Sequence, residues 1–229
     1  MRRTTLSGLL TLLLGLSALP AVAQGRLTLY CSSDAAWCQQ AKTEFEKKTG
    51  IQVDMTRKSS GETYAQIKAE SSNPKGDIWW GGTGDPHLQA AEEGLTQAYV
   101  SPLRDQLHDW AYRQAVAAKV RTVGIYSGAL GYGFNTELLK KQGLPEPKCW
   151  KDLVKPVYKG KIQVANPNSS GTAYTLLATL VQLFGEDEAF KMLKAMNANV
   201  NQYTKSGSAP IKAAGACETV IGIVFSHDA

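Results

Sequence analysis

Two serines, a glycine and a threonine in a row, from Ser169 to Thr172, form the stretch best suited to binding chemistry. An apolar run at 162–165 precedes them, 166–168 (Asn-Pro-Asn) breaks it, and a long apolar-rich run continues to Gly185. This order predicts a strand, a polar loop and a helix. A helix start leaves about four backbone N–H groups free and carries about half a positive charge, so hydroxyls and glycine there can bind an anion. Taken alone, the stretch is more simply interpreted as an ordinary serine N-cap.

The same loop chemistry recurs after other predicted strands. Strands are predicted at 27–30, 51–55 and 76–80, with helices between them, which favours a parallel α/β sheet. Small polar residues follow each strand: Ser32, Ser33 and Asp34; then Ser59 to Gly61; then Gly81 to Gly84, including Thr83. Ligands in open α/β sheets bind beyond the carboxyl ends of the strands. We therefore predict a ligand site where these loops converge. The glycine-rich run at 81–84 matches neither the Gly-x-Gly-x-x-Gly fingerprint nor a P-loop, so it does not predict a nucleotide site.

His227 and Asp228 follow the last predicted strand, at 220–225. Both side chains suit sugar hydroxyls, which donate and accept hydrogen bonds. An enzyme such as an exported phosphate-ester hydrolase would use this pair as half a triad, or Cys31 or Cys38 as a nucleophile. No third residue that could complete a triad or a metal site is identifiable in the sequence, so we expect neither enzymatic activity nor a metal site. His87 and His108 lie on presumed helix surfaces, and the tryptophans at 79–80 are more simply core residues than an adhesive patch.

Four cysteines fit an oxidising compartment, where an even number usually means disulfides. Three pairings are possible. Cys31 and Cys38 flank a short loop that they could close, which leaves Cys149 with Cys217 by elimination. The spacing gives little support for zinc, because no pair has the Cys-x-x-Cys pattern.

The first residues predict export. Arg2 and Arg3 precede an apolar run at 9–19, and Ala21 to Ala23 supplies a small-x-small cleavage pattern, so we expect a signal peptide at 1–23 and a mature start at Gln24. Loss of the two arginines lowers the formal charge from +5 to +3. This charge is too weak and scattered to favour nucleic acid or a membrane surface. No segment reaches the roughly 20 apolar residues of a membrane span.

The chain divides into two predicted lobes. We expect a first α/β lobe at 24–123, a crossing that acts as a hinge at 124–133, and a second lobe at 134–229. Glycines punctuate the extended stretch at 121–135, which favours a crossing between lobes. The core strand predicted at 220–225 lies close to the end of the sequence, so we expect the second lobe to be truncated.

Several longer motifs carry a family resemblance. They are the segments 133–140 (GFNTELLK), 147–154 (PKCWKDLV), 158–162 (YKGKI), 166–174 (NPNSSGTAY) and 203–210 (YTKSGSAP). Together they resemble the periplasmic substrate-binding proteins of ABC importers, in the branch that includes ferric-iron, phosphonate and sugar-phosphate binders. The likeness runs from about Leu27 onward. It implies the type II two-lobed fold with a ligand cleft, a membrane permease as partner, a periplasmic monomer without cofactor, and a family chain about 100 residues longer.

The resemblance also constrains the ligand. Iron binders place a histidine after the first strand, an acidic residue after the third and paired tyrosines in the second lobe. This chain instead has Asp34, a glycine-rich loop and Ser226 to Asp228 there, so iron is disfavoured. The loop at 169–172 corresponds to the place where related proteins hold an anion. We expect a hexose phosphate, with a phosphonate as the near alternative, bound by Ser32, Ser33, Asp34, Thr83, Ser169, Ser170, Gly171, Thr172, Ser206, His227 and Asp228.

Overall fold

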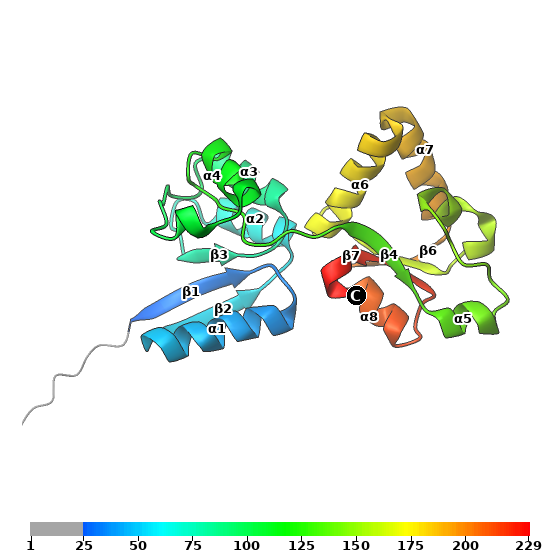
Figure 1. The fold of residues 1–229 in the computed structure, drawn as a ribbon, viewed down its shortest axis with the longest axis horizontal. Coiled ribbons are helices and arrows are strands. Elements are labelled where there is room, and N and C mark those ends of the chain that lie inside the picture. The colour runs from blue at the N-terminus through cyan, green and yellow to red at the C-terminus, as the bar shows by residue number, and fades with distance from the viewer. Residues whose placement is uncertain (1–24) are drawn as a thin grey trace, which may run out of the picture.

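The computed structural model describes residues 25–229, and the predicted signal peptide and cleavage site lie outside them. The first lobe holds a three-stranded, all-parallel sheet of order β2-β1-β3 (Figure 1). Its strands are β1 (Arg26–Cys31), β2 (Gln52–Arg57) and β3 (Ile78–Trp80). Its helices are α1 (Ala35–Thr49), α2 (Ser60–Ala69), α3 (Gly84–Glu92) and α4 (Asp109–Ala117), with a 3-10 turn at Arg104–Gln106.

Local signals set the helix ends of this lobe. Asp34 caps α1 by accepting a hydrogen bond from the Ala36 N–H, and Gly50 ends that helix at a φ of 72°. Ser59 and Glu62 form a capping box at the start of α2. The helices α1, α2 and α3 each begin shortly after the carboxyl end of a strand, which brings the polar loops to one edge of the sheet.

The second lobe holds a four-stranded sheet of order β4-β7-β5-β6. β5 is parallel to β6 and β7, and β4 is antiparallel to β7. The strands are β4 (Leu130–Phe134), β5 (Ile162–Ala165), β6 (Val200–Thr204) and β7 (Ile221–Phe225). The helices are α5 (Thr136–Lys141), α6 (Gly171–Phe184), α7 (Glu186–Asn197) and α8 (Ala209–Gly215), with 3-10 turns at Trp150–Val154, Pro156–Tyr158 and Ser226–Asp228.

The larger core lies in this second lobe. All four residues of β5 are buried, and α6 and α7 pack apolar side chains against the sheet, including Leu176, Leu180, Met192 and Met196. This burial matches the apolar run that predicted a core strand at 162–165. It also holds the N-terminus of α6 at a fixed place beyond the end of β5.

A single extended segment crosses between the lobes at 121–129, without helix or strand (Figure 1). β4 begins at Leu130 and belongs to the second sheet. The predicted crossing at 124–133 therefore runs four residues too far, because its glycines at 131 and 133 lie within a paired strand. None of the helices in residues 25–229 has the length and apolarity needed to cross a membrane.

One predicted disulfide is confirmed and the other is wrong. Cys31 and Cys38 are bonded and fully buried, joining the end of β1 to α1. Cys149 and Cys217 are both free and exposed. Cys149 lies at the start of a 3-10 turn, whereas Cys217 follows α8 at a φ of 62° and its sulfur accepts a hydrogen bond from the Asn135 side chain. Elimination could not predict this, because the separation of the two residues depends on the tertiary fold.

Removal of the buried bridge should destabilise the first lobe. The double variant Cys31→Ser with Cys38→Ser loses a cross-link across seven residues, and we expect the free energy of unfolding to fall by about 2–3 kcal/mol. Urea unfolding followed by circular dichroism measures this change. The matched control, Cys149→Ser with Cys217→Ser, should unfold like the wild type. Equal stability of both double variants would show that the bridge adds nothing.

Candidate ligand-binding site

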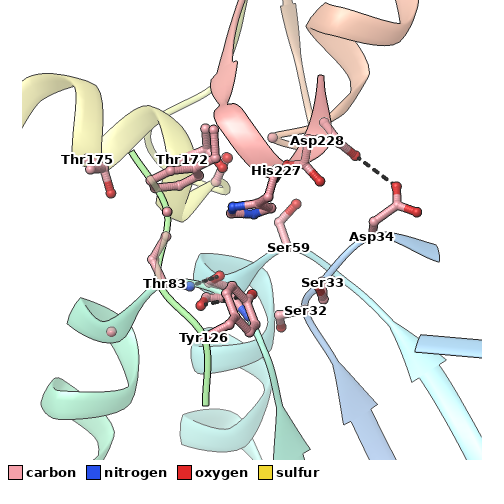
Figure 2. A pocket seen from close by; sticks show the side chains of 18 of the residues that line it. Ser32, Ser33, Asp34, Ser59, Thr83, Tyr126, Thr172, Thr175, His227 and Asp228 are labelled. Carbon is pink, nitrogen blue, oxygen red and sulfur yellow. Dashed lines mark hydrogen bonds and ion pairs between the residues drawn. The ribbon is translucent and has the colours of Figure 1, made fainter. Parts of the chain in front are cut away.

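A polar cavity of about 290 Å³ lies where the loops of the two lobes meet (Figure 2). The first lobe contributes residues that follow β1, β2 and β3, and the second contributes the start of α6, the loop at 206–208 and the end of β7. The structure thus brings most of the predicted residues together. Those lining the cavity are Ser32, Ser33, Asp34, Thr83, Ser170, Thr172, Ser206, His227 and Asp228.

The second lobe presents a group of neutral donors that we call the anion seat, formed by residues 170–172 and 206–208. Ser170 is buried and precedes α6, and its side chain makes no capping hydrogen bond to that helix. Gly207 packs closely against Thr172 and Ser170, so the two loops form one surface. The free N–H groups and positive dipole end of α6 therefore meet several hydroxyls in one place, which is the chemistry that holds an oxyanion.

Ser169 and Gly171 were predicted as ligand contacts, but they are not among the residues that line the cavity. The Ser169 carbonyl accepts a hydrogen bond of 3.0 Å from the Gly61 N–H of the first lobe. Gly171 lies directly against the Thr83 side chain, with no space for a Cβ atom. Both residues therefore bring the lobes into contact, and the predicted direct role in binding stays a prediction.

Two residues of the cavity lining, one from each lobe, hold a buried polar atom that makes no hydrogen bond within the described residues. They are Thr83 Oγ1 and His227 Nδ1. Thr83 Oγ1 lies against Gly171, and His227 Nδ1 lies against Gly128. Close packing against glycine therefore surrounds both atoms.

His227 is held by aromatic rings. Its ring stacks on Phe225 with centroids 5.4 Å apart, and lies 5.3 Å from Trp37 and 5.5 Å from Tyr126. Its Nε2 is 3.8 Å from the Asp228 carboxylate. Burial raises the pKa of Asp228, and the nearby His227 partly opposes that rise. Together His227 and Asp228 offer donors and acceptors that suit hydroxyl groups.

Asp34 lines the cavity but is already engaged between the lobes. Its carboxylate accepts hydrogen bonds from the Ala36 N–H and from Lys212 Nζ of α8, the latter at 2.6 Å. The hydrogen bond from Lys212 lowers the pKa of Asp34, and burial works against this change. Asp34 thus has less capacity left for a ligand than its place in the sequence implied.

Arg57 and Tyr126 also line the cavity and were not predicted. Arg57 is the last residue of β2, and residues at that position of a parallel strand face the ligand edge of the sheet. Its position close to the end of a predicted strand could have indicated Arg57 as a ligand contact. Tyr126 lies in the crossing segment, where its hydroxyl accepts a hydrogen bond from the Gly82 N–H at 2.7 Å. No sequence pattern marks this second contact.

Two α/β lobes joined by a crossing segment, with a polar cavity between their strand ends, define a solute-binding protein. The sequence profile of the bacterial extracellular solute-binding proteins matches residues 74–229, and the chain belongs to that family. The predicted type II two-lobed fold is therefore confirmed, as is the family resemblance. Among residues 25–229, no cluster of three or more His, Cys, Asp or Glu side chains could hold a metal ion.

Three known proteins illustrate the relationship. An uncharacterized protein of Haemophilus influenzae is 47% identical over 210 residues, which are 91% of this chain and 60% of that protein. The periplasmic binding protein AfuA from Actinobacillus pleuropneumoniae, solved with exogenous fructose-6-phosphate, has a TM-score of 0.84 and 47% identity, and the match covers 90% of this chain and 65% of AfuA. A putative 2-aminoethylphosphonate-binding periplasmic protein of Salmonella typhimurium is 25% identical over 191 residues, which are 80% of this chain and 52% of that protein. The chain thus spans less than two thirds of the length of each of these relatives.

The contact between Gly171 and Thr83 predicts a way to hold the lobes apart. In the variant Gly171→Ala the added Cβ would overlap the Thr83 side chain, while alanine suits the first position of α6. We expect a larger radius of gyration by small-angle X-ray scattering than for the wild type. Gly215→Ala is the control, because a Cβ there meets nothing within 4 Å. Identical scattering from all three proteins would refute the steric role.

The ion pair between Asp34 and Lys212 predicts a pH effect. A carboxylate whose pKa is lowered keeps its contact fully above its ordinary pKa and loses it as the pH falls through the lowered value. In Lys212→Gln we expect the pKa of Asp34 to rise toward its ordinary value, because the cationic hydrogen-bond donor that lowers it is gone. An NMR titration of the Asp34 side-chain carbon measures this. Lys205→Gln should leave the titration unchanged, because only the Lys205 backbone contacts the first lobe. An unaltered Asp34 pKa in Lys212→Gln would contradict the assignment.

Proposed function

We propose that this protein is the periplasmic solute-binding component of an ABC importer, and that it captures a small phosphorylated solute, most favourably a hexose phosphate. The observation that carries the proposal is the mixed lining of the cavity. It combines the anion seat with the pair His227 and Asp228 and the aromatic rings around His227.

The size and lining of the cavity support a small polar ligand. Its volume of about 290 Å³ is near the lower end of the ~300–1,000 Å³ typical of small-molecule sites. A phosphate in the anion seat would place the sugar hydroxyls near His227 and Asp228. AfuA, which shares the fold at 47% identity, was solved with fructose-6-phosphate, and this favours the same ligand class here.

The action we propose is capture without covalent chemistry. The lobes close about the crossing segment at 121–129, bury the solute, and present the closed form to a membrane permease. Export to the periplasm fits the signal pattern of the first residues and the buried Cys31–Cys38 bridge. We expect the protein to act as a monomer and to show no turnover of its solute.

A phosphonate is the second candidate. The Salmonella typhimurium relative is named as a putative 2-aminoethylphosphonate-binding protein, and a phosphonate group would use the same anion seat. The two ligands differ at the far end, where His227 and Asp228 favour hydroxyls. Ferric iron is less favoured, because Asp34, the glycine-rich loop at 81–84 and Ser226 to Asp228 stand where the family resemblance places the histidine, acidic residue and tyrosines of iron binders.

Calorimetric titration of the mature protein with fructose 6-phosphate, 2-aminoethylphosphonate and ferric citrate tests the proposal. We expect tight binding of the sugar phosphate. The double variant Ser170→Ala with Thr172→Ala should bind it more than about tenfold more weakly, because buried hydrogen bonds to a charged group contribute roughly 1.5–3 kcal/mol each.

The control is Thr179→Ala, on the same helix but away from the cavity lining. Tight binding of ferric iron alone would refute the ligand class. Unchanged affinity in the double variant would instead refute the anion seat while leaving the ligand class intact. Release of free phosphate during incubation with the sugar phosphate would contradict the absence of turnover.

A further inference from the structure

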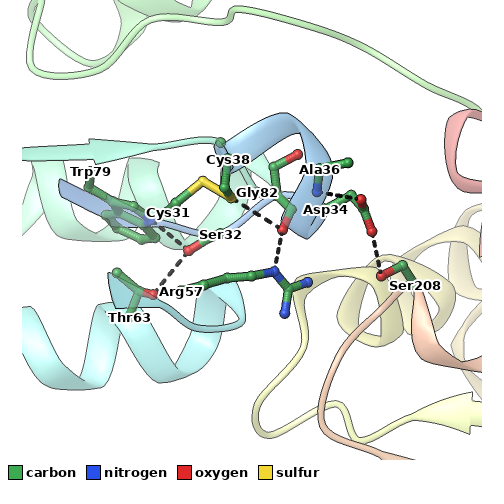
Figure 3. Close-up of a disulfide and its surroundings, with 12 residues drawn as sticks. Cys31, Ser32, Asp34, Ala36, Cys38, Arg57, Thr63, Trp79, Gly82 and Ser208 are labelled. Atoms are coloured by element: carbon green, nitrogen blue, oxygen red, sulfur yellow. Dashed lines mark hydrogen bonds between the residues drawn. A yellow bond between two sulfur atoms is a disulfide. The ribbon is translucent and has the colours of Figure 1, made fainter. Parts of the chain in front are cut away.

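Arg57 reaches from the first lobe toward the anion seat of the second. It ends β2, and its Nε donates a hydrogen bond of 2.8 Å to the Ser33 carbonyl (Figure 3). Its Nη2 donates a hydrogen bond of 3.2 Å to the Ser206 hydroxyl, which belongs to the anion seat. A guanidinium has about five N–H donors in a planar fork, so several remain available beyond these two contacts.

The charge of Arg57 is not held in an ion pair within residues 25–229, although Asp228 lies close enough for Arg57 to oppose the rise in its pKa. Arg57 is also the lone Lys or Arg side chain in the cavity lining. The carboxylates in that lining are Asp34, which pairs with Lys212, and Asp85 and Asp228. The anion seat itself consists of neutral hydroxyls and N–H groups. Arg57 would therefore supply the formal positive charge opposite a doubly charged phosphoryl group in the seat.

We propose that Arg57 is the residue that recognises the charge of the solute, by bridging a phosphate or phosphonate in the anion seat across the two lobes. This role rests on the proposed function and extends it, because Arg57 adds a formal positive charge to the N–H groups and hydroxyls of the seat. Guanidinium groups bind phosphoryl oxygens in bidentate fashion, with hydrogen bonds about twice as strong as neutral ones. Since the bridge forms only when the lobes are together, the charge of the solute would favour closure.

The test compares Arg57→Gln with the wild type by calorimetric titration of fructose 6-phosphate at low and high salt. We expect the variant to bind about 10- to 100-fold more weakly, which is the loss of charged hydrogen bonds of roughly 1.5–3 kcal/mol. We also expect its affinity to depend less on salt, because screening acts on the lost charge. Arg57→Lys keeps the charge without the fork and should lie between the two.

Lys58→Gln is the matched control. Lys58 is the next residue in the chain, its Nζ bonds to Gln66 at 2.6 Å, and it does not line the cavity. Its variant should bind and respond to salt like the wild type. Circular dichroism melting curves check that Arg57→Gln is folded, and Arg57→Lys keeps the test decisive if it is not.

The outcomes separate this inference from the proposed function. If the wild type binds neither fructose 6-phosphate nor 2-aminoethylphosphonate, the proposed function fails. If the wild type binds one of them, and folded Arg57→Gln binds it with the same affinity and salt dependence, the role of Arg57 is refuted. If Arg57→Lys binds with wild-type affinity and salt dependence, the bidentate contact is refuted, because the charge alone then suffices.

Discussion

The two lobes touch through their backbones, and this close approach governs the composition of the site. The Gly61 N–H bonds to the Ser169 carbonyl across the interface, and Gly171 lies against Thr83 with no room for a side chain. Large residues at the strand ends would hold the lobes apart. Glycine is therefore required at 61 and 171 by sterics, and the small residues beside them leave hydroxyls and N–H groups to line the cavity.

Charge is distributed unequally over this interface. Asp34 and Lys212 neutralise each other between the lobes, and the pKa of Asp228 is raised by its burial. In the second lobe the anion seat consists of neutral donors, and in the first lobe Arg57 forms no ion pair within residues 25–229. In the proposed complex, the seat can orient an anion in the open form, whereas Arg57 can balance the charge of that anion only in the closed form. The ligand then binds the two forms with different affinity, and only such a difference can shift the equilibrium between them.

Much of the architecture could be predicted from the sequence because its signals are local. The strand at 162–165 and the helix that follows it appear as predicted. The recurrence of small polar residues after strands located the cavity, since parallel strands end at one edge. The contacts of Arg57, Tyr126 and Lys212 were missed because each depends on a partner more than 40 residues away, in Ser206, Gly82 and Asp34. The free state of Cys149 and Cys217 was missed for the same reason.

The mixed lining of the cavity bears on how a solute would be selected. The anion seat offers hydroxyls and N–H groups, and His227 and Asp228 add donors and acceptors beside the aromatic rings. In the proposed complex, a free phosphate would occupy the anion seat and make no use of His227 and Asp228. A phosphorylated polyol would add hydrogen bonds from its hydroxyls to this pair, and each such bond contributes about 0.5–1.5 kcal/mol. The uncharged part of the solute would therefore raise its affinity above that of free phosphate.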